Sequence, residues 1–273
     1  FPFHFLKVKL DGDIAVGAKT LDTLLKNRHT PPALPSPSSK TTAEEDGSSH
    51  QRCWSIDANA GWTPSVAQAF LDTVLKHEPY RSLILMIEQP FPADIGIQAE
   101  PGRQTGDGGP DRGEAYDVAA WLKVKRAFND EGLLFYGDES VATVDDVERL
   151  HAAGLVDGVN IKMEKAGGYR QAMKAAQAAR DAGLRMWLGV MVGSVLNSNA
   201  IAHLLPMAEH CDVDGALLVQ DVDNRFTGGF EWVTLAVSRL AAAERQGAAV
   251  LCPHPQEMYA GCWGHVLLPH WTS

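Results

Sequence analysis

The sequence has few cysteines, no excess of basic residues and no long apolar run, and each shortage excludes a class of protein. Its four cysteines are scattered over 273 residues and are too few for a disulfide scaffold. The 24 Lys and Arg residues stand against 34 Asp and Glu, a net charge of -10, which argues against nucleic acid and membrane surfaces as partners. Because about 18 consecutive apolar residues are needed to span a membrane, no transmembrane helix is expected.

The low cysteine count favours a reducing compartment, and we expect a cytoplasmic protein. The chain begins at Phe1 inside an apolar run and without a methionine. We therefore interpret the N-terminus as missing and any targeting peptide as lying upstream.

Two stretches differ in composition from the rest. Residues 30–51 are rich in Pro, Ser and Thr, and residues 97–114 are rich in Gly and charge. We interpret both as surface insertions, because the same pattern of elements resumes after each. The second has no preceding strand and no Gly-Lys-Ser/Thr ending, so it is not expected to be a phosphate loop.

Short apolar segments alternate with amphipathic ones along the remaining chain. The expected strands are Phe5–Leu10, Cys53–Asp57, Leu83–Glu88, Leu133–Asp138, Gly158–Lys162, Arg185–Val192 and Cys211–Asp214. The expected helices between them include Thr63–His77, Val144–Ala153 and Tyr169–Ala182. This alternation predicts an α/β protein with a parallel sheet, a TIM-like (β/α)7β barrel that lacks one strand. An open doubly wound sheet is the alternative, but no G-x-G-x-x-G fingerprint follows the first strand.

Charged and polar residues stand at the predicted carboxyl ends of these strands. They are Lys7, Lys9, Asp57, Asn59, Glu88, Asp138, Glu139, Lys162, Asp212 and Asp214. In an α/β barrel the carboxyl ends of the strands face one mouth, where catalytic groups gather. Without the two insertions, the intervals between successive strand ends come close to one βα unit of roughly 30 residues. Ordinary surface ion pairs at loop starts are the alternative interpretation.

Three carboxylates, on Asp57, Glu88 and Asp138, would converge at this mouth from adjacent strands. Like charges do not gather without a cation, and an all-oxygen set favours Mg²⁺, with Mn²⁺ as second choice, over Zn²⁺. Lys9 and Lys162 fall on the strands either side, and a lysine whose pKa is lowered by nearby cations can act as a general base. The pattern predicts proton abstraction next to a carboxylate, with one base on each face of the carbon.

Five motifs resemble, in order and spacing, those of the enolase superfamily in its mandelate racemase/muconate-lactonizing subgroup. They are LKVKL (Leu6–Leu10), IDANAGW (Ile56–Trp62), IEQPF (Ile87–Phe91), GDES (Gly137–Ser140) and NIKMEKAGG (Asn160–Gly168). The family pattern fades after Trp232. We therefore predict a barrel domain over residues 1–232, with insertions at 30–51 and 97–114, and a divergent tail over 233–273. The family's capping domain and first barrel strand have no counterpart here, so the barrel is expected to be incomplete at the N-terminus.

The resemblance implies a role for each of these residues. Asp57, Glu88 and Asp138 would be the metal ligands, Lys9 and Lys162 the acid/base pair, Lys7 a helper that tunes Lys9, and Asn59 and Glu139 supports around the metal. The Asp212–Asp214 stretch is similar to the D-x-D motif with which dipeptide epimerases bind the substrate ammonium. Ser194 ends a stretch similar to the family's seventh strand, where a small residue leaves room for substrate.

The resemblance therefore implies a Mg²⁺-dependent isomerase, an epimerase or racemase that acts on dipeptides, either alone or as a homo-oligomer. Two alternatives stay open. One is another reaction of the subgroup, cycloisomerisation or o-succinylbenzoate synthesis, and the other is a non-catalytic barrel fragment. In the tail, a zinc site is a further alternative for Cys252, His254, Cys262 and His265, whose spacing is not that of a standard finger.

Overall fold

The computed structural model describes residues 6–27, 52–93, 118–213 and 215, together with the backbone of 230–233 and 266–269. Both predicted insertions lie outside the described residues. The same holds for Asp214 and for Cys252, His254, Cys262 and His265.

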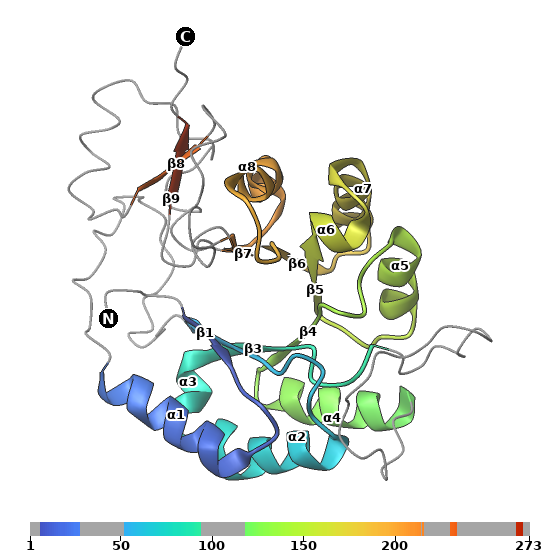
Figure 1. The fold of residues 1–273 in the computed structure, drawn as a ribbon. Helices are drawn as coiled ribbons and strands as arrows, with labels where there is room; N and C mark the ends of the chain where they lie inside the picture. Colours follow the sequence, from blue (N-terminus) through green and yellow to red (C-terminus); the bar gives the residue numbers. More distant parts are fainter. Residues whose placement is uncertain are drawn as a thin grey trace, which may run out of the picture.

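Seven parallel strands form one sheet, in the order in which they occur along the chain. They are β1 (Leu6–Lys9), β2 (Trp54–Asp57), β3 (Ile84–Glu88), β4 (Leu134–Gly137), β5 (Gly158–Lys162), β6 (Arg185–Gly189) and β7 (His210–Asp212). Figure 1 shows the sheet curling into part of a ring, with the helices on its outer side. The predicted incomplete α/β barrel is therefore confirmed.

Several strand bounds differ from the sequence prediction by one or two residues, and two differences are larger. The sixth strand was expected to reach Val192 but ends at Gly189, because its pairing with both neighbouring strands stops there. Met191 and Val192 beyond it are exposed. An antiparallel pair, β8 (Phe230–Val233) and β9 (Val266–Pro269), was not predicted at all. One of its strands falls in the segment interpreted as a divergent tail, where no strand pattern was recognised.

Helices connect successive strands. They are α1 (Ile14–Lys26), α2 (Pro64–Phe70), α3 (Tyr80–Leu83), α4 (Val118–Asp130), α5 (Val144–Ala152), α6 (Met163–Ala166), α7 (Tyr169–Asp181) and α8 (Val195–Ala202), with a π-helical turn η1 (Leu71–Leu75) that continues α2 and a 3-10 turn η2 (Leu205–Met207). The Thr63 side chain caps α2, and Thr143 forms a capping box with Asp146 at the start of α5. The three predicted helices are thus confirmed, the first being shared between α2 and η1.

Side chains of each strand alternate between the two faces of the sheet. Outward-facing side chains pack with the helices in one large core. On the inner face, Met86, Tyr136 and Trp187 form a separate buried cluster. Two positions further along their strands stand Glu88 and Asp138, so the alternation places a charged layer at the carboxyl ends above an aromatic layer.

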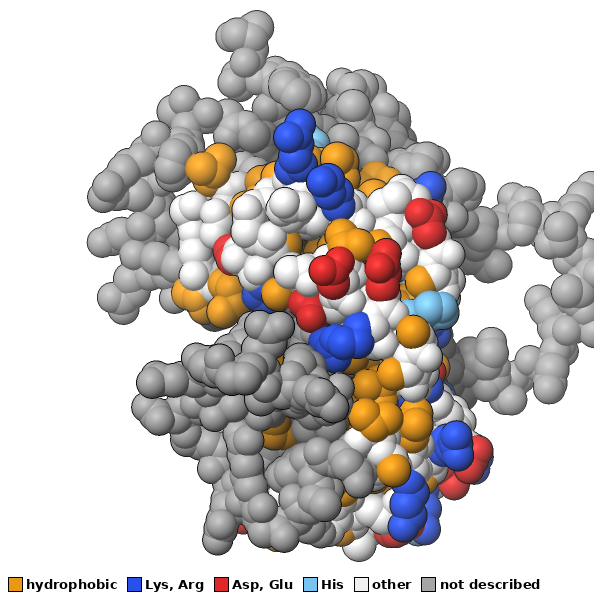
Figure 2. Space-filling model, turned by 90° about the vertical axis from the view of Figure 1, so that its right-hand side faces the viewer, with side chains coloured by type: hydrophobic (Ala, Val, Ile, Leu, Met, Phe, Trp, Pro, Cys, Tyr) orange, Lys and Arg blue, Asp and Glu red, His pale blue; other side chains and the backbone are white. Residues whose placement is uncertain are grey.

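No helix among the described residues is long and apolar enough to span a membrane. On the face shown in Figure 2, basic and acidic side chains are interspersed with apolar ones. The described part of this face therefore presents charges of both signs side by side.

Candidate active site at the carboxyl ends of the strands

Charged side chains gather where the strands end. They come from β1 (Lys7, Lys9), β2 (Asp57), β3 (Glu88), the residue after β4 (Asp138), β5 (Lys162) and β7 (Asp212). Asp57, Glu88 and Asp138 are almost completely buried. Because buried carboxylates require partners, the lysines around them decide the electrostatics of the site.

Lys7 is the central cation of this cluster. Its Nζ lies 3.0 Å from an oxygen of Glu88, 3.2 Å from one of Asp57 and 3.3 Å from one of Asp212. The side chain is 10% exposed, and its Nζ lies 5.7 Å from the centre of the Trp187 ring. Burial lowers the pKa of Lys7, but the carboxylates around it outweigh burial and hold that pKa well above its usual value. Lys7 therefore stays protonated and acts as a fixed counter-ion.

Glu88 is the most enclosed of the carboxylates. Its Oε1 accepts hydrogen bonds from Asn160 Nδ2 at 2.8 Å and from Lys7 Nζ at 3.1 Å. Its Oε2 lies near Lys7 Nζ but accepts no hydrogen bond from the described residues. Burial raises the pKa of Glu88 to about 8, and the attraction of Lys7 opposes that effect only in part. The positive charge of Lys7 therefore only partly compensates the burial of this carboxylate.

Lys9 contacts one of these carboxylates, that of Asp57, from the open side of the site. Its Nζ lies 2.9 Å from Asp57 Oδ2 and 2.9 Å from Asn59 Oδ1, and its side chain is 65% exposed. Asn59 in turn donates to Glu139 Oε1 at 3.3 Å. Burial raises the pKa of Asp57, but Lys7 and Lys9 outweigh burial and hold that pKa below its usual value. Lys9 is free to approach a molecule in the mouth, which Lys7 is not.

Asp138 is paired with two lysines. Lys162 Nζ donates to its Oδ2 at 2.6 Å, while Lys165 Nζ donates to its Oδ1 and to its backbone oxygen. Burial raises the pKa of Asp138, but Lys165 and Lys162 outweigh burial and hold that pKa well below its usual value. Lys165 was not predicted to belong to the site, although its position three residues after Lys162 was an available signal.

The two lysines on Asp138 differ in their pKa shifts. Burial lowers the pKa of Lys162, but the Asp138 carboxylate outweighs burial, so the pKa lies above its usual value. At Lys165 burial prevails over the same carboxylate, and the pKa lies below its usual value. A base with a lowered pKa was expected from the sequence. The pKa of Lys162 is raised instead, because the anionic Asp138 carboxylate lies 2.6 Å from its Nζ.

Gln89 also supports the site and was missed by sequence reasoning. Its Oε1 accepts from the backbone N–H groups of Asp138 at 2.8 Å and Ser140 at 3.2 Å. Its Nε2 donates to Phe91 O and to Ser140 Oγ, both at 2.7 Å. The Gln89 backbone has φ of 37°, a left-handed conformation that is costly for a non-glycine residue. The side chain therefore fixes the loop that carries Asp138.

Gly189 leaves room beside Lys162. The two residues are partners in the register of β5 and β6. A Cβ at position 189 would lie 2.8 Å from Asn160 Oδ1 and 3.0 Å from Lys162 Cε. Only glycine avoids this conflict. Gly189 therefore contributes to the site by leaving space for Asn160 and Lys162.

The predicted substrate-binding residues are placed differently from one another. Asp212 ends β7 and faces Lys7 Nζ. Asp214 lies outside the described residues. Ser194 is exposed at the N-cap position of α8, where its side chain makes no capping hydrogen bond. Of the three, the structure brings only Asp212 into the charged cluster among the described residues.

The three carboxylates have the chemistry that a divalent cation of the magnesium type prefers, but the structure does not bring them together on one point as the sequence predicted. In the described part of the chain, no three Asp, Glu, His or Cys side chains lie close enough together to hold a metal ion. Lys7 and Lys162 contact the carboxylates instead. Even so, all donors are carboxylate oxygens, and the Oε2 of buried Glu88 lacks a hydrogen bond. Asp57, Glu88 and Asp138 are the residues that would hold such a cation.

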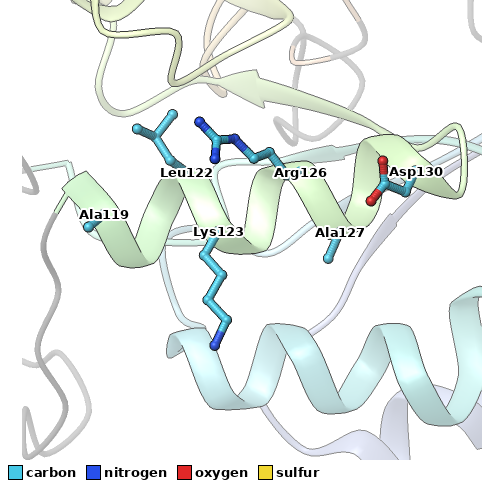
Figure 3. A pocket seen from close by; sticks show the side chains of 6 residues that line it. All are labelled: Ala119, Leu122, Lys123, Arg126, Ala127 and Asp130. Carbon is cyan, nitrogen blue, oxygen red and sulfur yellow. The ribbon is translucent and has the colours of Figure 1, made fainter.

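A hollow along α4 lies apart from this site. It is lined by Ala119, Leu122, Lys123, Arg126, Ala127 and Asp130. Figure 3 shows that all six come from one helix, with Leu122 and Lys123 on opposite sides of it. None of them stands at the carboxyl end of a strand, so the hollow does not belong to the candidate active site.

Comparison with known proteins relates this chain to a family. The family described as enolase C-terminal domain-like matches residues 114–247. This range contains Asp138, Lys162 and Asp212. The relation of the chain to the enolase superfamily, which the five motifs predicted, is confirmed.

Particular relatives are similar over much of this chain. It is 36% identical over 224 residues to an enolase superfamily member of Dictyostelium discoideum, covering 81% of this chain and 45% of that protein. It is 34% identical over 164 residues to an L-Ala-D/L-amino acid epimerase of Pedosphaera parvula, covering 60% of this chain and 39% of that protein. A dipeptide epimerase of Cytophaga hutchinsonii, solved with Mg and the dipeptide D-Ala-L-Val, has a TM-score of 0.50 and 25% identity over 67% of this chain and 41% of its own. The chain spans less than half the length of each of these proteins.

Proposed function

We propose that this chain carries the barrel part of an isomerase that epimerises a dipeptide at the α carbon of its C-terminal residue. The proposal rests on the order of groups across five adjacent strands. Lys9 stands at one end and Lys162 at the other, with the buried carboxylates of Asp57, Glu88 and Asp138 between them. Two bases separated by a site for positive charge suit removal and return of a proton on opposite faces of one carbon. The epimerase among its relatives supports the substrate class.

Magnesium is the cofactor that we propose, with Mn²⁺ as the second choice. Asp57, Glu88 and Asp138 would hold it through oxygen atoms, as this kind of cation prefers. When bound, the cation would neutralise the substrate carboxylate and the negative charge that develops as the α proton leaves. The magnesium in the similar dipeptide epimerase supports this choice.

Lys9 and Lys162 would move the proton. One lysine, with its Nζ deprotonated, takes the α proton, and the electron pair of the broken C–H bond passes into the adjacent carboxylate group. The ammonium of the other lysine then gives a proton to the opposite face of the carbon, which inverts it. The raised pKa of Lys162 suits it to begin as the donor, and the exposure of Lys9 suits it to reach the substrate. Lys7 stays charged and holds the carboxylates in place.

Asp212 would bind the ammonium group of the dipeptide, with Asp214 beside it and Ser194 at the edge of the substrate. A carboxylate for a cationic substrate favours a dipeptide over the amine-free substrates of cycloisomerases. The assignment of these three residues remains a prediction, since only Asp212 lies within the described charged cluster.

Exchange of the α proton in D₂O, followed by NMR, tests the proposal. The substrates are a panel of L-Ala-L-Xaa dipeptides, each with Mg²⁺ and with EDTA, and N-acetylated dipeptides serve as controls without an ammonium group. We expect metal-dependent exchange at the C-terminal residue only, and none with the acetylated controls. A chain that melts cooperatively and is stabilised by Mg²⁺, yet exchanges no dipeptide, would contradict the proposed function. Exchange of the acetylated controls alone would favour another reaction of the subgroup.

A further inference from the structure

Lys165 is a buried lysine of α6 that the proposed proton transfer does not use. Its side chain is 18% exposed. Its Nζ donates to Asp138 Oδ1, to Asp138 O and, at 3.3 Å, to Asn160 O. These contacts use all three hydrogen-bond donors of an ammonium group. A solvated counter-ion needs no such set of fixed acceptors, so the side chain is held in one position.

The local sequence folds so as to bring Lys165 back to the strand end. Strand β5 ends at Lys162, and α6 makes a single turn from Met163 to Ala166. Gly167, with φ of 81°, ends this turn in the left-handed conformation. Lys162 is the last residue of the strand and Lys165 lies on the turn that follows it, and the Nζ of each reaches Asp138.

The two lysines divide the Asp138 carboxylate between them. Lys162 takes Oδ2, and Lys165 takes Oδ1 together with the backbone oxygen. Gln89 holds the backbone N–H of the same residue at 2.8 Å. We propose that Lys165 is a positioning residue, which fixes the Asp138 carboxylate so that Oδ2 alone faces Lys162 and thereby sets the place of the Lys162 Nζ. This inference rests on the proposed function for the role of Lys162, but not for the contacts themselves.

Loss of this contact should lower turnover more than substrate binding. Asp138 is 1% exposed, so without Lys165 its carboxylate would turn both oxygens toward Lys162, its remaining charged partner. A displacement of about 1 Å at a reacting group can cost on the order of 100-fold in rate. We expect Lys165→Met to lower kcat for α-proton exchange by about 10- to 100-fold, as for other residues that orient metal-site groups, with KM changed by less than about threefold.

Three variants test this role. Lys165→Met removes the charge at nearly constant length, and Lys165→Arg keeps the charge but alters its geometry, which gives a second variant if the first is poorly folded. Lys174→Met is the matched control, because Lys174 is an exposed lysine of α7. The first readout is the separation of kcat from KM. The second is backbone hydrogen exchange around Asp138–Val141, where Val141 N–H donates to Asp138 O at 2.9 Å.

We expect both Lys165 variants to lose turnover and to exchange the Asp138–Val141 amides faster, while amides of α7 keep their protection and Lys174→Met resembles the parent. Parental kcat and parental protection in Lys165→Met would overturn the inference, as would loss of protection throughout the molecule in both Lys165 variants. If the parent chain turns over no dipeptide, the proposed function fails, and the hydrogen-exchange measurement still decides the role of Lys165.

Discussion

Lys7 Nζ and Asp212 Oδ2 lie 3.3 Å apart, although their strands, β1 and β7, are the two edges of the seven-stranded sheet. The sheet therefore curls far enough for one ion pair to join its edges at the mouth. The same ammonium group contacts Asp57 and Glu88, so a single lysine links the carboxyl ends of four strands. Site electrostatics and barrel curvature are coupled through this residue.

This coupling predicts that Lys7→Met destabilises the fold. Removing one partner from a buried ion pair leaves uncompensated charge and costs about 3–5 kcal/mol. Urea unfolding at pH 8 measures the loss, which should shrink at pH 5, where Glu88 can take up a proton. Lys19→Met, at an exposed position of α1, is the control and should change stability by less than about 0.5 kcal/mol. An equally small effect at Lys7 would show that the cluster does not depend on this cation.

Magnesium binding should release a proton from Glu88. Its pKa is raised from 4.5 to about 8, so between these values the folded chain holds a proton that the unfolded chain does not. That protonated state stabilises the fold at low pH, and its contribution is lost as pH rises through about 8. The cation would bind only the ionised form of Glu88. The affinity of the chain for Mg²⁺ should therefore fall about tenfold for each pH unit below 8.

Calorimetry at pH 7 in two buffers of different ionisation enthalpy measures this release. We expect close to one proton per bound cation in the parent chain, and weaker binding without that proton in Glu88→Gln. Magnesium binding with no proton released at pH 7 would remove Glu88 from the set of ligands.

The strands and their charged ends could be predicted because their pattern is local. Continuous apolar runs such as Leu83–Ile87 indicate buried parallel strands, and this one is followed by Glu88, a charged residue that a buried strand would not otherwise carry. The end of β6 could not be predicted in the same way. Met191 and Val192 continue the apolar run of Arg185–Gly189 in composition, and only the geometry of the sheet leaves them exposed.

Within the site, most of the lysine contacts could not be predicted from the sequence. The alternation of a strand places Lys7 and Lys9 on one face, but it does not distinguish the enclosed lysine from the exposed one. The contact of Lys165 with Asp138 depends on the single turn of α6. Gly189 matters because a side chain there would crowd Asn160 and Lys162. The contacts of Lys7 and the space beside Gly189 depend on distances between strands, which sequence spacing does not encode.

Gly189→Ala should impair the site while leaving the fold intact. The added Cβ would lie 2.8 Å from Asn160 Oδ1, so Asn160 must shift away from Glu88 or Lys162 must shift away from Asp138. We expect a loss of about tenfold or more in α-proton exchange and a stability cost of about 1–3 kcal/mol.

Gly12→Ala is the matched control for this substitution, because its nearest atoms would lie 3.7 Å from a Cβ, an ordinary contact. Exchange kinetics and urea unfolding are measured on both variants. Equal effects at positions 12 and 189 would show that the loss reflects a general response to added volume rather than the place of Lys162.

Replacing Lys9 and replacing Lys162 should impair the proton exchange of opposite epimers. If Lys9 and Lys162 serve opposite faces of the α carbon, each one handles the proton of one epimer. Lys9→Ala and Lys162→Ala should therefore both abolish epimerisation, yet each should keep solvent exchange with the epimer served by the remaining lysine.

Exchange is measured separately for both epimers of one dipeptide in D₂O, with metal affinity measured in parallel and Lys19→Ala as the control for removing a lysine. Both variants should keep magnesium binding, because neither lysine is a proposed ligand. If one variant loses exchange of both epimers and the other loses neither, a single base serves both faces and the two-base assignment is wrong.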